Sequence, residues 1–201
     1  MLSSDIKQKL TNIFTEKLKD NVEIVLDLNI DEISDNVENL IKEIAETSDK
    51  IKIIEENLNL GLKPAIQIRK KDYNNFTYFG LPSGGEFQTF IESIIYISAN
   101  THKIPPREAE FVKDIDKKVN IKLFITKSCG WCPPTIKQAL GFSILNKNVF
   151  VNVIDSFDFP EVAQKYNVST VPKIVINDKV EFVGHRSENE FLGYIFSAVG
   201  S

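Results

Sequence analysis

One internal repeat constrains the fold of this 201-residue chain more than any other feature of its sequence. Residues 78–87 align with residues 182–191 at a constant offset of 104 residues. The identical pairs in that alignment are Gly80 and Gly184, Ser83 and Ser187, Glu86 and Glu190, and Phe87 and Phe191. Two further matches lie upstream, namely the proline-led runs 63–68 and 171–176 and the β-branched runs 22–26 and 121–126. Three matches in the same order predict two structural units of one design.

Each unit is predicted to contain, in order, a helix, a strand, a helix, a strand, a proline-led strand, a further strand and a closing helix. The second unit is expected to open with a helix near 108–117, because two prolines precede it and suit a linker or a helix start. A strand, a crossover helix and a parallel strand, with an antiparallel hairpin appended, make a small α/β unit with a mixed sheet flanked by helices. The predicted domains are therefore residues 1–100 and residues 101–201.

Composition restricts the classes of partner. A formal net charge of -4 offers no basic face for nucleic acid and no polybasic anchor for a membrane surface. No stretch approaches the roughly 20 apolar residues of a membrane span, and the first residues lack the basic and apolar regions of a signal peptide. We therefore expect a cytoplasmic protein whose partner is another protein.

The only two cysteines of the chain lie in the second unit, in the motif Cys129-Gly130-Trp131-Cys132. The motif follows a predicted strand and opens a predicted helix. At a helix start, unpaired N–H groups and the helix dipole favour thiolate over thiol, so Cys129 is the predicted nucleophile. Lys127 is expected to add to this effect. Cys132, one turn further in, is the predicted resolving thiol.

Three other interpretations of the cysteine pair compete with this one. A zinc site needs two more ligands, and the only imidazoles, His102 and His185, lie outside any ligand-like spacing. A structural disulfide across so short a loop would contribute only about 2 kcal/mol, and a reducing compartment would open it. A chance pair of core cysteines disagrees with Trp131, which lies between the two and has the character of an exposed loop residue.

A second element is the run Thr170-Val171-Pro172, in which a proline opens a strand beside the dithiol. A cis bond there would turn the edge of Val171 toward the sulfurs and leave its backbone free to pair with an extended substrate peptide. A trans proline that merely begins the strand is equally compatible with the spacing. The predicted substrate-binding residues are therefore Gly130, Trp131, Thr170, Val171 and Pro172.

Together these motifs resemble the thioredoxin and glutaredoxin superfamily, whose Val-Pro bond is cis. The tandem arrangement is similar to the protein disulfide oxidoreductases, also called glutaredoxin-like proteins. It also resembles the N-terminal domain of the alkyl hydroperoxide reductase flavoprotein subunit, through residues 43–50, Lys63-Pro64 and residues 79–87. The resemblance implies two tandem thioredoxin-like units and a thiol-disulfide oxidoreductase without bound cofactor or metal. Its redox-active disulfide, Cys129–Cys132, would be reduced indirectly from NAD(P)H by a thioredoxin-reductase-like flavoprotein and would pass electrons to a protein disulfide, such as that of a peroxiredoxin.

The sequence departs from this family pattern at several points. The first unit carries residues 29–34 after its strand, without cysteine, and is predicted to be redox-silent. No Gly-x-Gly-x-x-Gly fingerprint occurs, so a separate flavoprotein, or a module outside these 201 residues, must supply electrons. Leu123 stands where thioredoxins carry a buried acid, so proton release from Cys132 must rely on water or another group. Residues 183–186 offer one glycine and a cation where glutaredoxins have a glycine pair, so glutathione dependence is not expected.

Three questions stay open from the sequence. Pro64 and Gly80 persist in the silent unit, either as a docking groove or because they hold the fold together. The dithiol could also work as a protein disulfide oxidase or isomerase, since its reduction potential sets the direction. A non-catalytic docking adaptor is the alternative from another class, and it would have an unreactive thiol at Cys129.

Overall fold

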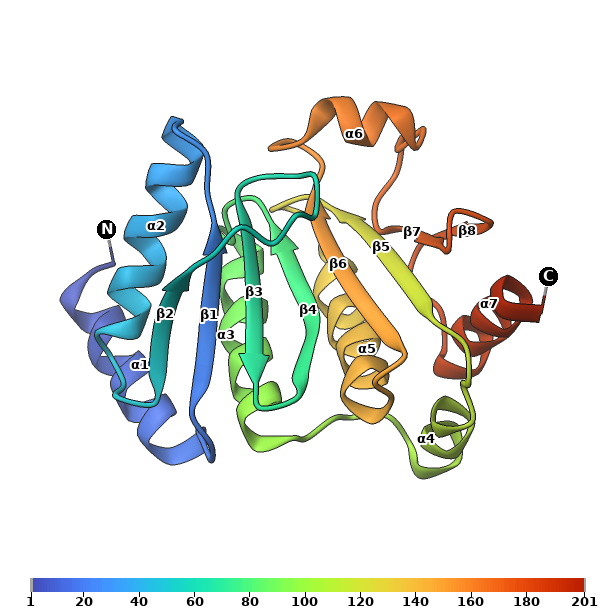
Figure 1. Cartoon of the computed structure of the whole chain (residues 1–201), viewed down its shortest axis with the longest axis horizontal. Coiled ribbons are helices and arrows are strands. Elements are labelled where there is room, and N and C mark those ends of the chain that lie inside the picture. The colour runs from blue at the N-terminus through green and yellow to red at the C-terminus, as the bar shows by residue number, and fades with distance from the viewer. Residues whose placement is uncertain (1, 201) are drawn as a thin grey trace.

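The computed structural model describes residues 2–200, which form one mixed sheet of eight strands in the order β2-β1-β3-β4-β6-β5-β7-β8 (Figure 1). The first unit contains α1 (Ser4–Lys17), β1 (Val22–Asp27), α2 (Glu32–Ala45), β2 (Ile51–Glu55), β3 (Ala65–Lys70), β4 (Tyr73–Phe79) and α3 (Gly85–Ala99). The second contains α4 (Pro106–Lys113), β5 (Val119–Ile125), α5 (Cys132–Leu145), β6 (Val149–Asp155), α6 (Pro160–Lys165), β7 (Lys173–Ile176), β8 (Val180–Val183) and α7 (Glu188–Gly200). The predicted α/β class and element order are confirmed, with α6 as an additional helix.

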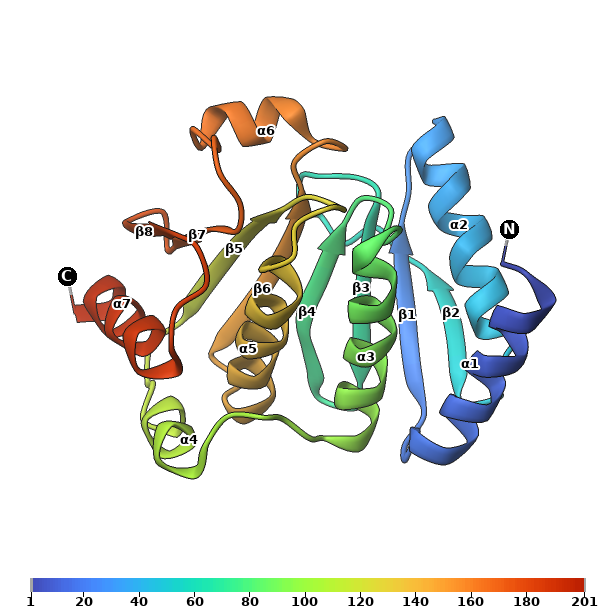
Figure 2. The same cartoon turned by 180° about the vertical axis from the view of Figure 1, so that it is seen from behind.

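The two units share one sheet because β4 and β6 pair in parallel, from Phe76 opposite Val151 to Phe79 opposite Ile154. Within each unit the first strand pairs in parallel with the second and antiparallel with the proline-led strand. Figure 2 shows α3 and α5 side by side over the same face of the sheet. The carboxyl ends of β1 and β5 therefore point to one end of a continuous sheet, although they belong to different units.

Two apolar cores lie on the two faces of the sheet. The larger one lies under α3 and α5 and includes Ile24, Tyr78, Phe90, Leu123 and Cys132. The smaller one, on the opposite face, consists of Ala65, Phe79, Phe124, Ile154 and Val175, covered by Leu58, Leu62, Phe159 and Val162. The unpredicted helix α6 covers the end of this second face, and it carries little apolar periodicity because it is only 6 residues long.

The helix expected at 108–117 begins and ends earlier than predicted. Pro106 is its first residue, a position where the missing N–H costs nothing. The helix ends at Lys113 because the Asn146 side chain donates to the carbonyls of Val112 and Ile115, at 2.7 and 2.9 Å. A continuing helix would have used those carbonyls itself.

The shared sequence pattern gives both units the same backbone device. The Lys63–Pro64 and Val171–Pro172 bonds are both cis. The Gly80 N–H donates to the Pro64 carbonyl at 3.1 Å, and the Gly184 N–H donates to the Pro172 carbonyl at 2.8 Å. The contact is the same with or without a dithiol nearby, which favours the interpretation that proline and glycine hold the fold of the first unit.

The two units differ in the loop that would carry a dithiol. Strand pairing sets Asp27 opposite Ala65, which follows one cis-proline, and Phe124 opposite Lys173, which follows the other. From Asp27 the chain reaches the first residue of α2, residue 32, in five steps, whereas from Phe124 it reaches the first residue of α5, residue 132, in eight. The first unit is therefore three residues shorter at this point, which is where the second unit holds its dithiol.

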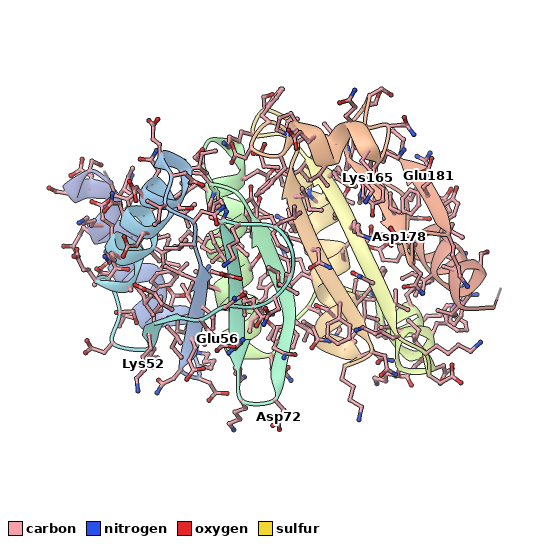
Figure 3. The ribbon with its side chains drawn as sticks, turned by 45° about the horizontal axis from the view of Figure 1, so that its top comes forward. Lys52, Glu56, Asp72, Lys165, Asp178 and Glu181 are labelled. Carbon is pink, nitrogen blue, oxygen red and sulfur yellow. A yellow bond between two sulfur atoms is a disulfide. The ribbon has the colours of Figure 1, made fainter. Side chains whose placement is uncertain are left out.

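Ion pairs join separate segments near each edge of the sheet. Glu56, after β2, accepts two hydrogen bonds from the Arg69 guanidinium, at 2.8 and 3.0 Å. Asp178, in the turn between β7 and β8, accepts from Lys122 and from the Tyr166 hydroxyl, and Figure 3 labels both carboxylates. Within residues 2–200, no helix has the length and apolar character that crossing a membrane requires.

Candidate active site

The two cysteines occupy the connection from β5 to α5 and form a disulfide, with their Cα atoms 5.5 Å apart. Cys132 is the first residue of α5 and is fully buried, whereas Cys129 lies in the preceding loop and is partly exposed. The Cys129 N–H donates to the Thr126 carbonyl at 3.1 Å, which folds the loop back on the end of β5. Cys129 is therefore the member of the pair that solvent or a partner reaches.

The start of α5 is unusual because Pro133 and Pro134 follow Cys132 directly. They remove two of the four N–H groups that a helix start normally leaves unpaired. The N–H group of Cys132 remains at the helix start, together with the positive end of the helix dipole. This arrangement favours a thiolate at the helix start, as reactive cysteines require.

The cis bond implied by the resemblance is present at Val171–Pro172. Because Phe124 pairs with Lys173, Pro172 lies beside the end of β5, where the dithiol loop starts. Val171 is partly buried against the same core as Cys129.

The remaining predicted substrate-binding residues are accessible. Trp131 is 66% exposed, and Gly130 and Thr170 are also exposed. An added side-chain carbon at Gly130 would meet no described atom within 4 Å. All five predicted residues therefore gather where β5 stops and β7 starts, and three of them form an open surface.

Lys127, which we expected to assist Cys129, pairs with two carboxylates. The Lys127 ammonium lies 2.8 Å from Asp158 Oδ1 and 3.6 Å from Asp155 Oδ2. Two carboxylates therefore compensate its charge. Asp158 also accepts the Leu81 N–H at 2.8 Å, so this ion pair joins the loop before α3 to the dithiol loop of the other unit.

A buried acid lies beside this junction. Glu86 is fully buried, and neither of its carboxylate oxygens has a hydrogen-bond partner among residues 2–200. Burial raises the pKa of Glu86 to about 7, and the charge of Asp155 adds to the shift. The preceding Gly85 N–H donates to the Lys127 carbonyl at 3.0 Å, a close approach that a side chain at residue 85 would crowd. A carboxyl group that exchanges its proton near neutral pH thus lies next to the segment leading into Cys129.

Glu86 belongs to a small set of buried polar groups contributed by both units. The Tyr78 hydroxyl and Asp155 Oδ2 are, like Glu86, without a hydrogen-bond partner in the described chain. Burial raises the pKa of Tyr78 well above its usual value, and the charges of Asp155, Glu86 and Asp158 raise it further. Burial also raises the pKa of Asp155. Tyr78 and Glu86 come from the unit without cysteines, so that unit contributes buried ionisable groups to the junction between the two units.

Sequence reasoning missed two residues near the dithiol. The repeat aligns Glu86 with Glu190, but Glu190 is exposed and caps α7 through Ser187. The available signal was the pair Gly84-Gly85, which lets Glu86 approach the other unit. The spacing of His185 excluded it as a zinc ligand and indicated no other role, yet its ring stacks on Trp131. No local pattern could have placed the loop after β8 against the start of α5.

Comparison with known proteins agrees with this architecture. Residues 12–100 match the family model of a thioredoxin-like domain, and residues 119–197 match that of the thioredoxin domain. The chain is 28% identical over 178 residues to the F subunit of the alkyl hydroperoxide reductase of Staphylococcus aureus, an alignment that covers 88% of this chain and 34% of that protein. The chain therefore spans about a third of the length of the curated relatives it matches.

Two solved structures share the fold of the whole chain. One is the NTD_N/C domain of alkylhydroperoxide reductase from Enterococcus faecalis, with 18% identity, a TM-score of 0.85 and coverage of 97% of this chain and 100% of that one. The other is a protein disulfide oxidoreductase from Aeropyrum pernix, with 24% identity, a TM-score of 0.87 and coverage of 100% and 95%. Both likenesses concern the tandem arrangement of the two units.

Proposed function

Both units of this chain are thioredoxin-fold domains in one tandem, and we propose that the chain is a protein disulfide oxidoreductase working through Cys129 and Cys132. The observation that carries the proposal is the dithiol itself, with an accessible sulfur in the loop and a buried one at the helix start, beside a cis-proline. The segment that contains exposed Thr170 and partly buried Val171 would offer an edge for an extended substrate segment.

The reaction is two successive thiol-disulfide exchanges. The Cys129 thiolate attacks one sulfur of a protein disulfide, forming a mixed disulfide and releasing the first substrate thiolate. The Cys132 thiol then loses its proton and attacks the Cys129 sulfur, which releases the second substrate thiolate. Two electrons have moved to the substrate, and the protein is left with the Cys129–Cys132 disulfide.

The second exchange requires a group that takes the proton from buried Cys132. Leu123 occupies the strand position at which the related thioredoxins hold an acid, and it is fully buried. Glu86 is a buried carboxyl beside the segment that leads into the dithiol, and a pKa of about 7 suits reversible proton transfer at neutral pH. We assign it this role, so that the silent unit supplies the base and the other unit supplies the sulfurs.

The electron source and the substrate are inferred from the relatives. The F subunits of alkyl hydroperoxide reductases are about three times as long as the region that matches this chain. We propose that a thioredoxin-reductase-like flavoprotein, using NAD(P)H, reduces the disulfide and that a peroxiredoxin is the substrate. A dithiol that cycles in this way suits the reducing cytoplasm.

Two serine variants test the reaction directly. With insulin as substrate and dithiothreitol as reductant, Cys129→Ser should abolish turnover. Cys132→Ser should accumulate a covalent adduct with the substrate, visible by mass spectrometry and removed by excess reductant. Full turnover by Cys129→Ser would sink the assignment and favour a docking adaptor, as would an iodoacetamide reaction at Cys129 that shows the pH dependence of an ordinary thiol.

The reduction potential decides the direction. Equilibration with a defined thiol buffer should give a value near the thioredoxin range of about -270 mV if the protein donates electrons. A value of about -120 to -180 mV would assign it instead to disulfide formation or isomerisation.

A further inference from the structure

The one tryptophan of the chain is covered on one side by an imidazole. The rings of Trp131 and His185 are nearly parallel, at 13°, with their centroids 5.8 Å apart. Trp131 lies between the two cysteines, and His185 lies in the loop from β8 to α7. Because Trp131 remains 66% exposed, the stack leaves most of the indole free for a partner.

Thr135 ties the two residues together. Its hydroxyl donates to the Trp131 carbonyl at 2.8 Å, and its oxygen lies 3.1 Å from His185 Nδ1. A hydroxyl has a single hydrogen, so the Thr135 oxygen must accept from His185, and Nδ1 must carry the proton. This bond fixes both the tautomer and the orientation of the imidazole ring.

The loop that carries His185 is held on both sides. The Gly184 N–H donates to the Pro172 carbonyl at 2.8 Å, and Gln138 Nε2 donates to the Arg186 carbonyl at 3.1 Å. The loop is thus bound to the cis-proline and to α5 at once. It is a fixed support against which the indole rests.

The first unit shows that the fold does not need this imidazole. At the offset of 104 residues, Leu81 corresponds to His185, and the glycine before each makes the same backbone contact. The loop of the first unit that corresponds to the dithiol loop contains neither tryptophan nor cysteine. The imidazole therefore belongs to the redox-active unit and not to the shared architecture.

We propose that His185 is a positioning residue that holds the Trp131 indole as part of the surface on which a protein disulfide docks. This inference rests on the proposed function. An aromatic side chain already fixed in one orientation loses less conformational entropy when a partner binds.

A spectroscopic experiment tests whether His185 holds the Trp131 indole, without relying on activity. The steady-state fluorescence anisotropy of reduced wild type, His185→Leu and His185→Phe is recorded at one neutral pH. Because Trp131 is the only indole, removing the ring that supports it should lower the anisotropy in His185→Leu, and His185→Phe should restore part of it. His102→Leu, which removes the other histidine, is the matched control and should keep the wild-type anisotropy. Equal anisotropy in wild type and His185→Leu overturns the proposal.

Kinetics with insulin provide the second readout. We expect KM to rise about twofold to tenfold in His185→Leu with kcat retained, which corresponds to losing one aromatic stacking contact. His185→Phe keeps a flat ring and should recover part of the loss. Equal KM values in wild type and His185→Leu contradict the inference. If wild type itself fails to reduce insulin, the proposed function is refuted, and the fluorescence anisotropy still decides whether His185 holds Trp131.

Discussion

Replacing Glu86 with glutamine should make the protein more stable at neutral and alkaline pH. The pKa of Glu86 is about 7 in the folded protein, against 4.5 for an unperturbed glutamate. As pH rises above 4.5, the unfolded chain gives up this proton while the folded protein keeps it. The wild-type protein therefore loses stability until the pH passes the pKa of Glu86 in the folded state. The Glu86→Gln variant does not lose stability in this way.

The size of the effect follows from the two pKa values. Each unit of difference corresponds to about 1.4 kcal/mol, so wild type should lose about 2.5 kcal/mol between about pH 5 and about pH 8 through Glu86 alone. Glu86→Gln, which has nearly the same shape, should lack this loss. Urea unfolding with the disulfide intact, at both pH values, measures the difference between the two proteins.

The repeat provides a matched control of opposite sign. Glu190 is exposed, and hydrogen bonds from the hydroxyl and N–H of Ser187 lower its pKa. Its contribution to stability is therefore present above the pKa of the unfolded chain and lost on acidification. Between the same two pH values, Glu190→Gln should still lose the stability that wild type loses through Glu86. If Glu86→Gln also kept that loss, the buried carboxyl would not titrate in this range, and its assigned role as a base would be wrong.

The same variant should slow the resolving step. General base catalysis typically contributes about 10²-fold to 10⁴-fold, so Glu86→Gln should accumulate the mixed disulfide on Cys129 at neutral pH. Rapid acid quenching followed by mass spectrometry would show the adduct. Unchanged decay of the adduct would mean that water takes the proton from Cys132.

Two substitutions test how the units are joined, each measured by urea unfolding. Gly80→Ala should cost more than about 1 kcal/mol, because residue 80 has φ of 104° and an added side-chain carbon would lie 2.6 Å from Asp158 Oδ2. Gly193→Ala, inside α7 with no described atom within 4 Å of the added carbon, should instead stabilise by about 0.5–1 kcal/mol; equal losses at both glycines would contradict the argument. Asn75→Ala should cost about 1–3 kcal/mol, because its buried amide donates to two backbone carbonyls at the start of β6, both at 2.8 Å. A loss below the low end of that range would mean that water replaces the amide at the joint between β4 and β6.

The sequence predicted the element order well because that order depends on local chemistry. Alternating apolar residues, a proline that opens a strand and a glycine in the closing turn recur in both halves, and Gly80 and Gly184 both have positive φ. The position of Cys132 at a helix start is likewise a local property. Helix limits were less accurate, since α4 ends where the distant Asn146 side chain takes its carbonyls.

What the sequence did not show depends on contacts between residues far apart in the chain. Lys127 was expected to support the thiolate, but its ammonium is paired with Asp158, which lies 31 positions further along the chain. The environment of Glu86 depends on α3 starting against the Lys127 carbonyl. The same amino acid is therefore buried at residue 86 and exposed at residue 190, because only Glu86 faces the other unit.

These contacts explain why a unit without cysteine persists beside one that has them. The first unit is three residues shorter where a dithiol loop would fit, yet β4 completes the sheet next to β6. In the proposed mechanism its Glu86 supplies the carboxyl group that the buried Leu123 does not. With Glu86 as the proposed base, the acid and the sulfurs belong to different units. The pairing of β4 with β6 would then serve the chemistry as well as the fold, since any change in that pairing would move the acid relative to the sulfurs.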